Sequence, residues 1–295
     1  MKLVITAPLY VSKQAHIDFI DETIKSIKTK HDYEIIFIEN YIDPLLRSQV
    51  MEVLNGKGDI IKNPIGNNVA AGWNEGIREA LKRGAEYVLI PNLDIIFHPE
   101  AIDNLVEFAD NWENPGVFSC SEWTNRRTIN NLKIEPVSKD GKIKLDIFDG
   151  ETHHDWDAYD TEHPHFSCFM VSFMGIERLA QYEKDFAEPE LGLFDPGYVS
   201  AYFEDQDYHQ RILMAKHNGV QIEAIKVNSA IFYHYGSRTI KSDEQLEREN
   251  TNTYEKNRIY FKNKFGYDSH GLVPTNGERV QLSFPYPFNI PPRTS

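Results

Sequence analysis

The sequence predicts a mixed α/β fold in which a mostly parallel central sheet is flanked by helices. From residue 2 to residue 90, short apolar runs rich in β-branched side chains alternate with stretches whose apolar residues recur at helical spacing. Such strand–helix alternation is typical of a parallel sheet with right-handed crossovers. With 295 residues, of which 41% are hydrophobic and 26% charged, the chain is long enough to bury a large core.

The elements of this first part follow in order along the chain. Strands are predicted over residues 2–7, 33–38, 59–61 and 86–90, and helices over residues 13–30, 44–54 and 68–83. The first helix is predicted because Ile17, Ile20, Ile24 and Ile27 lie three or four positions apart. The third helix ends at Gly84, a residue that commonly terminates helices.

The second part of the chain is less regular. Helices are predicted over residues 99–111, 203–217 and 242–265, and strands over residues 117–121, 166–173, 222–225 and 230–234. Residues 124–164 are polar and rich in Asp and His, so we expect an irregular insertion outside the core. Residues 277–295 carry several prolines and predict an extended tail.

Composition excludes some classes of function. The net charge of −14, without a long basic block, argues against a nucleic-acid partner. The sequence has no signal-peptide pattern and no apolar run of the ~18 residues that a membrane span needs. Cys120 and Cys168 lie in apolar runs and are expected as buried free thiols. We therefore expect a cytoplasmic protein, in a cell or a virus-infected host cell, without a transmembrane segment.

Asp94 is the most informative single residue. It follows the apolar run that begins at Tyr87 and lies two positions after Asn92. This places its carboxylate at or beyond the carboxyl end of a strand, the edge at which open α/β sheets bind ligands. A carboxylate and an amide at that edge suit a hard divalent cation that carries phosphates. The alternative is a turn or cap residue without a ligand.

Two other segments are predicted to reach the same edge. The turn around Gly66 leads into the helix that starts near Asn68, and helix N-termini favour phosphate, although Asn68 also fits a simple cap. His234 ends an apolar strand, where it either presents an imidazole to a cation or diphosphate, or is a satisfied core residue. The sequence contains no Walker-A motif and no Gly-x-Gly-x-x-Gly, which argues against an ATPase or a dinucleotide-binding enzyme.

Glu204, Asp205 and Asp207 lie at the predicted start of a helix, directly after an aromatic run. Complementarity to the helix dipole is one explanation. Adjacent carboxylates repel each other, however, and crowding or burial raises a carboxyl pKa, as a general base requires. We favour the catalytic interpretation. The cluster of His and Asp at residues 153–165 lacks structural-zinc spacing, and we interpret it as a solvated loop, with contact to an acceptor as the alternative.

In this order and at this spacing, the segments resemble the family 2 glycosyltransferases of the GT-A, Rossmann-like fold. The resemblance covers about residues 2–266 and leaves the insertion at 124–164 uncovered. Asn92-Leu93-Asp94 has the form of the rhamnosyltransferase-like branch, and Glu39 stands where the family usually has Asp. The other motifs are Thr6-Ala7-Pro8, Asn63 to Gly66, Asn74-Glu75-Gly76, Phe194-Asp195, residues 202–207, His234 with Gly236, and residues 257–266.

The resemblance implies an enzyme that moves a sugar from a nucleotide-diphosphate sugar to an acceptor hydroxyl with inversion. It implies that Asp94 and His234 hold Mn²⁺ or Mg²⁺, and that Asp205, with Glu204 beside it, is the catalytic base. The acceptor is a glycan, a lipid-linked glycan, a protein or a small molecule. Donor contacts are implied for Thr6, Pro8, Glu39, Asn68, Asn74, Asn92 and Arg211.

The resemblance also implies a division of the chain. Residues 1–275 would form one GT-A domain, with a nucleotide-sugar-binding half at 1–121 and an acceptor and catalytic half at 122–275, followed by a Pro-rich tail at 276–295. Two alternatives remain open. One is a sugar-nucleotide-binding module without turnover. The other is a nucleotidyltransferase, which normally needs a Gly-rich basic loop that residues 6–16 do not provide.

Overall fold

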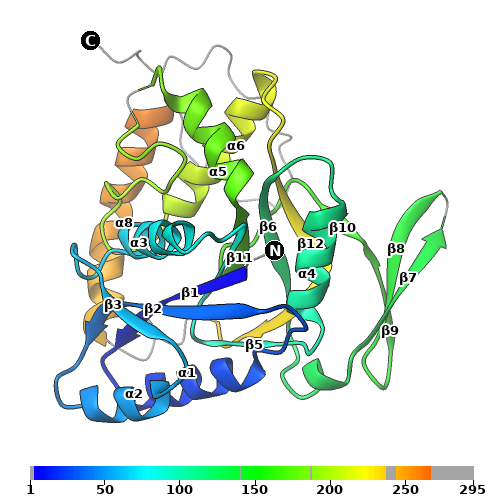
Figure 1. Ribbon diagram of the computed structural model, residues 1–295, viewed down its shortest axis with the longest axis horizontal. Coiled ribbons are helices and arrows are strands. Elements are labelled where there is room, and N and C mark those ends of the chain that lie inside the picture. Colours follow the sequence, from blue (N-terminus) through cyan, green and yellow to red (C-terminus); the bar gives the residue numbers. More distant parts are fainter. Residues whose placement is uncertain (1–2, 140, 187, 237–243, 267–295) are drawn as a thin grey trace.

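A central sheet of nine strands organises the protein, with strand order β10-β12-β6-β11-β4-β1-β2-β3 and with β5 paired to β12 (Figure 1). The computed structural model describes residues 3–139, 141–186, 188–236 and 244–266. The strands are β1 Leu3–Val11, β2 Tyr33–Ile42, β3 Asp59–Lys62, β4 Tyr87–Pro91, β5 Ile95–Phe97, β6 Gly116–Trp123, β10 Tyr159–Asp160, β11 Cys168–Ser172 and β12 Glu223–His234.

The predicted parallel arrangement is confirmed in the first half of the sheet. Strands β1, β2, β3 and β4 pair in parallel, and β12 pairs in parallel with β6. Strand β11 differs, because it lies antiparallel between β4 and β6. The carboxyl ends of β1, β2 and β4 therefore share one edge, as the sequence predicts, and β11 begins near that edge because it runs in the opposite direction.

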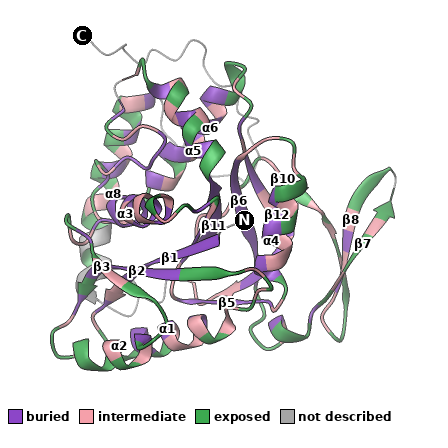
Figure 2. Cartoon of the chain, viewed as in Figure 1, coloured by how far each residue is buried: buried purple, intermediate pink, exposed green. Residues whose placement is uncertain are grey.

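Helices cover both faces of this sheet (Figure 1). Their bounds are α1 Gln14–Ser26, α2 Arg47–Leu54, α3 Val69–Lys82, α4 Ala101–Asn111, α5 Phe173–Glu183, α6 Glu204–His217 and α8 Glu244–Phe265. Consecutive residues of β1 point to opposite faces of the sheet. Ile5 packs in a core with α1, α2 and α4, and Val4 packs in a second core with α3, α5 and α6. Figure 2 shows this burial along the central strands.

Local signals explain where several helices begin and end. Asn68 caps α3 by accepting a hydrogen bond from the Ala71 amide at 2.8 Å. Gly84 follows α3 with a φ of +78°, a conformation that glycine adopts without steric cost, so the predicted end of this helix is confirmed. Helix α5 has no counterpart in the sequence prediction. Ser172 caps it, but the helix starts directly at the end of β11 with no intervening loop residues to signal the change.

The insertion is more regular than the sequence predicts. It contains a short 3-10 helix at Ile129–Asn131 and a three-stranded antiparallel sheet of β7 Lys133–Lys139, β8 Lys142–Phe148 and β9 His153–Asp157. Leu145 and Ile147 point from β8 into a small core that also contains Trp123. Few apolar side chains are needed to bury one face of so small a sheet, and the polar composition therefore concealed it.

Three further predictions have simple outcomes. The two strands predicted at residues 222–225 and 230–234 are one strand, β12, with a register shift between Val227 and Ile231. Both cysteines are free and buried, as expected. The predicted tail at 276–295 lies outside the described residues. Within the described ranges, every helix falls short of the length or the apolarity that a bilayer crossing needs.

Candidate active site

A cleft of about 410 Å³ opens at the sheet edge where β1, β2 and β4 end. Widely separated segments contribute to it: Pro8 from β1, Asn40 from β2, Asp94 from the turn after β4, and His234 from the end of β12. The start of α6 contributes Glu204 and Asp205 to the same cleft. The cleft therefore gathers the residues of the predicted metal site and those of the predicted catalytic pair.

Asp94 and His234 meet because β5 and β12 pair in antiparallel register. His234 lies opposite Ile95, and the backbone amide of Tyr235 donates a hydrogen bond to the Asp94 carbonyl at 3.0 Å. The His234 Nε2 atom consequently lies 3.2 Å from Asp94 Oδ1, and both side chains are largely buried. Burial lowers the pKa of His234, but the Asp94 carboxylate raises it more, so the pKa lies above the usual 6.5.

This pair fits a divalent cation. Two ligands at right angles around an ion with bonds near 2.1 Å lie about 3 Å apart, close to the observed separation. The Nε2 atom of His234 is buried and makes no well-directed hydrogen bond within the described protein. A carboxylate oxygen and an imidazole nitrogen that face a cleft are a donor set for Mn²⁺ or Mg²⁺ whose remaining ligands come from phosphates and water.

Glu204 and Asp205 begin α6 and experience an unusual electrostatic environment. Burial raises the pKa of Glu204 well above its usual value, and the neighbouring Asp205 charge adds to the effect. Burial also raises the pKa of Asp205, although backbone amides partly oppose the shift. The two carboxyls thus favour sharing one negative charge, with Glu204 as the protonated member. A partly desolvated, ionised Asp205 has the character of a general base.

The segment that precedes α6 is strained. Ser200, Tyr202 and Phe203 have φ values of 60°, 78° and 77°, a region that residues other than glycine rarely adopt. Each such residue costs on the order of 1–3 kcal/mol and is kept when surrounding contacts hold it in place. Ser200 and Tyr202 also line the cleft, so this strain lies at the site itself.

Three polar atoms of the cleft residues are buried without a well-directed hydrogen bond in the described protein: Trp73 Nε1, Glu204 Oε2 and His234 Nε2, the last of which lies 3.2 Å from Asp94 Oδ1. Buried polar groups are nearly always satisfied in folded proteins, so three in one cleft indicate a site completed by a ligand. Trp73 lies on the buried face of α3, and the sequence analysis did not identify it as a site residue.

The structure distributes the predicted donor-binding residues unevenly. Pro8 and Asn92 line the cleft. The Glu39 carboxylate instead forms a paired contact with the Arg47 guanidinium at 2.8 and 2.9 Å, and this hydrogen bonding lowers the pKa of Glu39. Its neighbour Asn40 lines the cleft, because consecutive strand residues point to opposite faces. Asn40, one position after the predicted donor contact at Glu39, is thus a cleft residue that the family motif did not identify.

Three other predicted donor contacts have structural roles here. A Cβ on Gly76 would lie 2.8 Å from Thr6, so Thr6 packs beneath α3. Asn68 caps α3 and donates to the Tyr198 carbonyl at 2.9 Å. The Asn74 side chain exchanges two hydrogen bonds with the Phe194 backbone, at 2.7 and 2.9 Å. None of these side chains lines the cleft, and together they fasten α3 to the sheet and to the segment before α6.

Arg211 is also placed away from the cleft. Its guanidinium is 2% exposed and contacts Asp207 at 2.7 Å, Glu183 at 2.5 Å and the Leu193 carbonyl at 2.6 Å. Position 211 lies one helical turn after Asp207, which directs both side chains into the interface beneath α6 rather than toward the donor. The structure thus assigns Arg211 to an internal ion-pair network.

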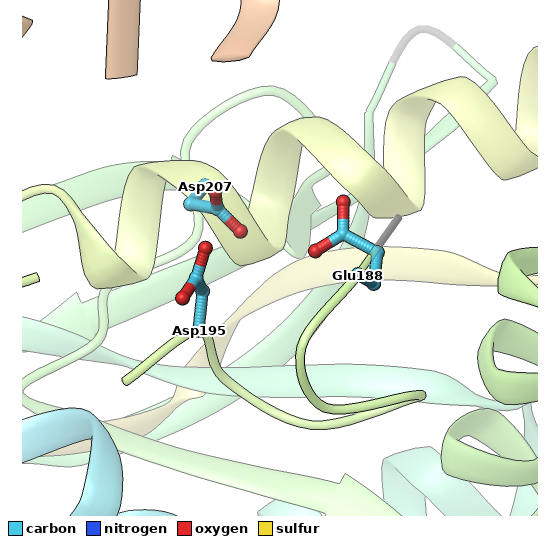
Figure 3. Close-up of side chains that lie close together, drawn as sticks. All are labelled: Glu188, Asp195 and Asp207. Atoms are coloured by element: carbon cyan, nitrogen blue, oxygen red, sulfur yellow. The ribbon is translucent and has the colours of Figure 1, made fainter. Parts of the chain in front are cut away.

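The same network contains a group of three buried carboxylates, Glu188, Asp195 and Asp207, whose oxygens lie close enough to share a cation (Figure 3). The ammonium of Lys264 from α8 already lies among them, at 2.7, 2.9 and 2.7 Å from the three in that order. A divalent ion would have to displace this lysine, and none of the three acids lines the cleft. Asp94 and His234, by contrast, both line the cleft, and they are the candidate ligands for a cation there.

A second groove, of about 700 Å³, adjoins the cleft. His165 lines both, and its Nε2 atom lies 3.1 Å from the Glu122 carboxylate. Tyr159, Trp156 and Lys226 also line this groove, and the Tyr159 ring packs against Phe108 and Trp112 with centroids 5.9 and 4.8 Å apart. Its acidic residues are Glu122, Asp155, Asp157, Asp160 and Glu162.

Several of the residues at 153–165 border this groove, and contact with an acceptor stays a prediction. The predicted loop is wrong for His153–Asp157, which form strand β9. Each of His153, His154 and His163 pairs with a nearby carboxylate, at 2.9, 3.3 and 3.4 Å respectively. Among the described residues, they do not gather into a group of three metal-ligating side chains.

Comparison with known proteins gives one family match: the family described as Glycosyl transferase family 2 matches residues 8–179. No curated protein sequence matches the chain. Among solved structures, a mannosyltransferase, PcManGT from Pyrobaculum calidifontis in complex with GDP-Man and Mn²⁺, matches with a TM-score of 0.47 and 14% identity, over 79% of this chain and 56% of that one.

Two further solved structures are similar at the same distant level. GalNAc-T7 with UDP, GalNAc and Mn²⁺ has a TM-score of 0.49 and 10% identity, over 79% of this chain and 44% of that one. S. aureus TarS 1–349 in complex with UDP has a TM-score of 0.49 and 14% identity, over 92% of this chain and 73% of that one. The chain therefore spans about half the length of the mannosyltransferase and of GalNAc-T7.

Proposed function

The chain belongs to glycosyl transferase family 2, and from this premise we propose that it transfers a sugar from a nucleotide-diphosphate sugar to an acceptor hydroxyl, with inversion and with a divalent cation. The observation that carries the proposal is the cleft that brings Asp94 and His234 together with Glu204 and Asp205. One pair suits a cation and the diphosphate it binds, and the other suits removal of a proton.

The side chains of the cleft define the steps. Asp94 and His234 would hold Mn²⁺ or Mg²⁺, which supplies positive charge where the departing diphosphate develops negative charge. Asp205 accepts the proton of the acceptor hydroxyl while the acceptor oxygen bonds to the anomeric carbon. The bond from that carbon to the diphosphate oxygen breaks on the opposite side, and the nucleoside diphosphate leaves. Pro8, Asn40 and Asn92 line the part of the cleft that we assign to the donor.

The two alternatives differ from this proposal in what they consume and release. A nucleotidyltransferase would combine a nucleoside triphosphate with a sugar phosphate and release pyrophosphate. A binding module would bind a nucleotide sugar and release nothing. The sugar itself is not assigned: the rhamnosyltransferase-like form of Asn92-Leu93-Asp94 remains a prediction that the comparisons do not support.

A screen of nucleotide sugars with Mn²⁺ and Mg²⁺ tests the reaction type. We expect at least one donor to release nucleoside diphosphate, chelation with EDTA to abolish the release, and added Mn²⁺ or Mg²⁺ to restore it, because Asp94 and His234 alone cannot neutralise the leaving diphosphate. Turnover that survives chelation would rule out the metal role. Release of pyrophosphate from a triphosphate would favour the nucleotidyltransferase, and thermal stabilisation by nucleotide sugars without any turnover would favour the binding module.

We place the acceptor in the second groove. The groove meets the cleft at His165, and its aromatic and carboxylate lining suits the apolar faces and hydroxyl groups of a neutral sugar. Its acidic side chains outnumber its cationic ones, which disfavours phosphorylated acceptors and agrees with the expectation against nucleic acid. A glycan, whether free or attached to lipid or protein, satisfies this chemistry better than an anionic acceptor.

Replacing Tyr159 by Ala tests this placement once an active donor is found. We expect the KM for a neutral glycan acceptor to rise about tenfold, a loss of ~1.4 kcal/mol, while hydrolysis of the donor stays unchanged. The matched control is Tyr33→Ala, because Tyr33 is 41% exposed, nearly the same as the 40% of Tyr159, and lies outside both cavities. Equal acceptor KM values in the two variants would argue against the second groove.

A further inference from the structure

Asn257 of α8 is 1% exposed and directs its carboxamide at the segment before α6. Its Oδ1 atom accepts a hydrogen bond from the Val199 amide at 2.9 Å. Its Nδ2 group donates to the carbonyls of Val199, Ala201 and Tyr202 at 2.9, 3.0 and 3.1 Å. One side chain thus contacts the backbone at three of four consecutive positions.

This backbone is the strained wall of the cleft. Ser200, Tyr202 and Phe203 have positive φ values, and Ser200, Ala201 and Tyr202 line the cleft. Strained backbone persists only where neighbouring groups determine it. The carboxamide of Asn257 satisfies carbonyls that this conformation turns away from regular secondary structure, and it therefore selects that conformation over less strained ones.

Two other kinds of contact hold this segment, one backbone hydrogen bond and a set of aromatic contacts, and Asn257 is the side chain that makes most of its polar contacts. At the opposite side, the Val69 amide of α3 donates to the Ser200 carbonyl at 3.0 Å. Phe203 packs against Tyr254 and Phe261, on the same helix as Asn257, with ring centroids 5.1 and 5.9 Å apart. Phe203 is also the N-cap residue of α6, directly before Glu204, so its position sets where Glu204 and Asp205 lie.

We propose that Asn257 is a positioning residue of the catalytic site: it holds residues 199–203 in their strained conformation and thereby places the carboxyls of Glu204 and Asp205 in the cleft. The effect on turnover rests on the proposed function, whereas the effect on the segment does not. No metal ligand is involved, because Asp94 and His234 belong to other elements.

Hydrogen exchange tests the structural part independently of any substrate. In the wild-type protein, the Val199 amide should exchange as slowly as amides inside α6, because its partner is a buried side chain. In Asn257→Ala, residues 199–203 should lose protection at least tenfold while β1, β4 and α3 keep theirs. The matched control is Asn263→Ala, which changes an exposed Asn on the same helix and should alter neither region.

Kinetics test the functional part with a donor from the screen. Asn257→Ala should lower kcat about 100-fold, since misplacing a catalytic group by about 1 Å has effects of this size, while the affinity for Mn²⁺ remains within twofold of wild type. A purely structural role would instead reduce the folded fraction and leave kcat per folded molecule unchanged.

The outcomes separate the two proposals. Rapid exchange of Val199 in the wild type, or a folded Asn257→Ala protein with unchanged exchange and kcat, would overturn the role of Asn257. If Asn257→Ala does not fold, Asn257→Ser, which keeps a small hydrogen-bonding group, provides the same comparison. If slow exchange depends on Asn257 but the wild type turns over no donor, the role of Asn257 in holding residues 199–203 is supported and the proposed reaction is wrong.

Discussion

Asp94→Asn is expected to reduce donor turnover by about 100- to 1,000-fold and to weaken Mn²⁺ binding strongly. The substitution keeps the size of the side chain but removes the charge that faces His234 at 3.2 Å. A cation on a leaving diphosphate contributes several kcal/mol, and each ~1.4 kcal/mol corresponds to a factor of ten in rate. Rates at saturating donor and isothermal titration with Mn²⁺ measure the two effects.

The matched control for this change is Asp18→Asn, which neutralises an exposed carboxylate on α1 and should leave rate and metal affinity unchanged. Excess Mn²⁺ is expected to recover part of the activity of Asp94→Asn, because His234 and an amide oxygen still face the ion. Wild-type metal affinity in Asp94→Asn would show that the cation binds elsewhere. In that case the three carboxylates around Lys264, namely Glu188, Asp195 and Asp207, become the next candidate for the cation site.

Asp205→Asn is expected to reduce kcat by about 10²- to 10⁴-fold, the usual range for loss of a general base. Nucleotide and metal binding should remain near wild type, because Asp205 belongs to α6 whereas the predicted cation ligands Asp94 and His234 belong to other segments. Measuring kcat, donor KM and Mn²⁺ affinity in the same variant therefore distinguishes a lost base from a damaged site.

The pH profile adds an independent check on Asp205. A general base works only when it is ionised, so kcat rises with pH through its pKa. Because burial raises the pKa of Asp205, the rise should lie above the ordinary aspartate value near 3.8. Asp205→Asn should abolish this limb, whereas the exposed control Asp185→Asn should retain it.

Glu204→Gln resolves which of the two carboxyls is the base. Burial raises the pKa of Glu204 well above its usual value, so a neutral amide resembles the state we assign to it. We expect this variant to retain more activity than Asp205→Asn, and to leave the acidic limb close to its wild-type position because a neutral amide replaces a neutral carboxyl. A larger loss in Glu204→Gln than in Asp205→Asn would reverse the assignment.

The sequence could identify the strands and most helices because their signals are local. Apolar alternation and helical spacing depend on neighbouring residues, and these predicted the β1 to β4 region with its three helices. Helix α5 was missed because no loop residue separates it from β11, and the sheet of the insertion was missed because only a few apolar side chains, which pack with Trp123, bury its inner face. The tail at 276–295 is not tested, because it lies outside the described residues.

For the site, the sequence identified the kinds of residue better than their contacts. Asp94 was found from its place at the end of a strand. The acids at the start of α6 were found from their crowding, and the choice of Asp205 among them came from the family resemblance. Arg211 shows the limit of predicting side-chain contacts from sequence. A position on a helix does not reveal which face will be covered, and Lys264, whose position decides the use of the nearby acids, comes from a helix at the far end of the chain.

By itself, the sequence determined the parallel α/β framework, the strand-end carboxylate of Asp94 and the acidic start of α6, because each is written in consecutive residues. Tertiary structure alone decided that Asp94 faces His234, that Asn40 rather than Glu39 faces the cleft, and that Asn257 supports the strained segment. The physical reason is that these contacts depend on strand register, side-chain direction and helix packing, which are set only when distant segments bury their apolar surfaces together.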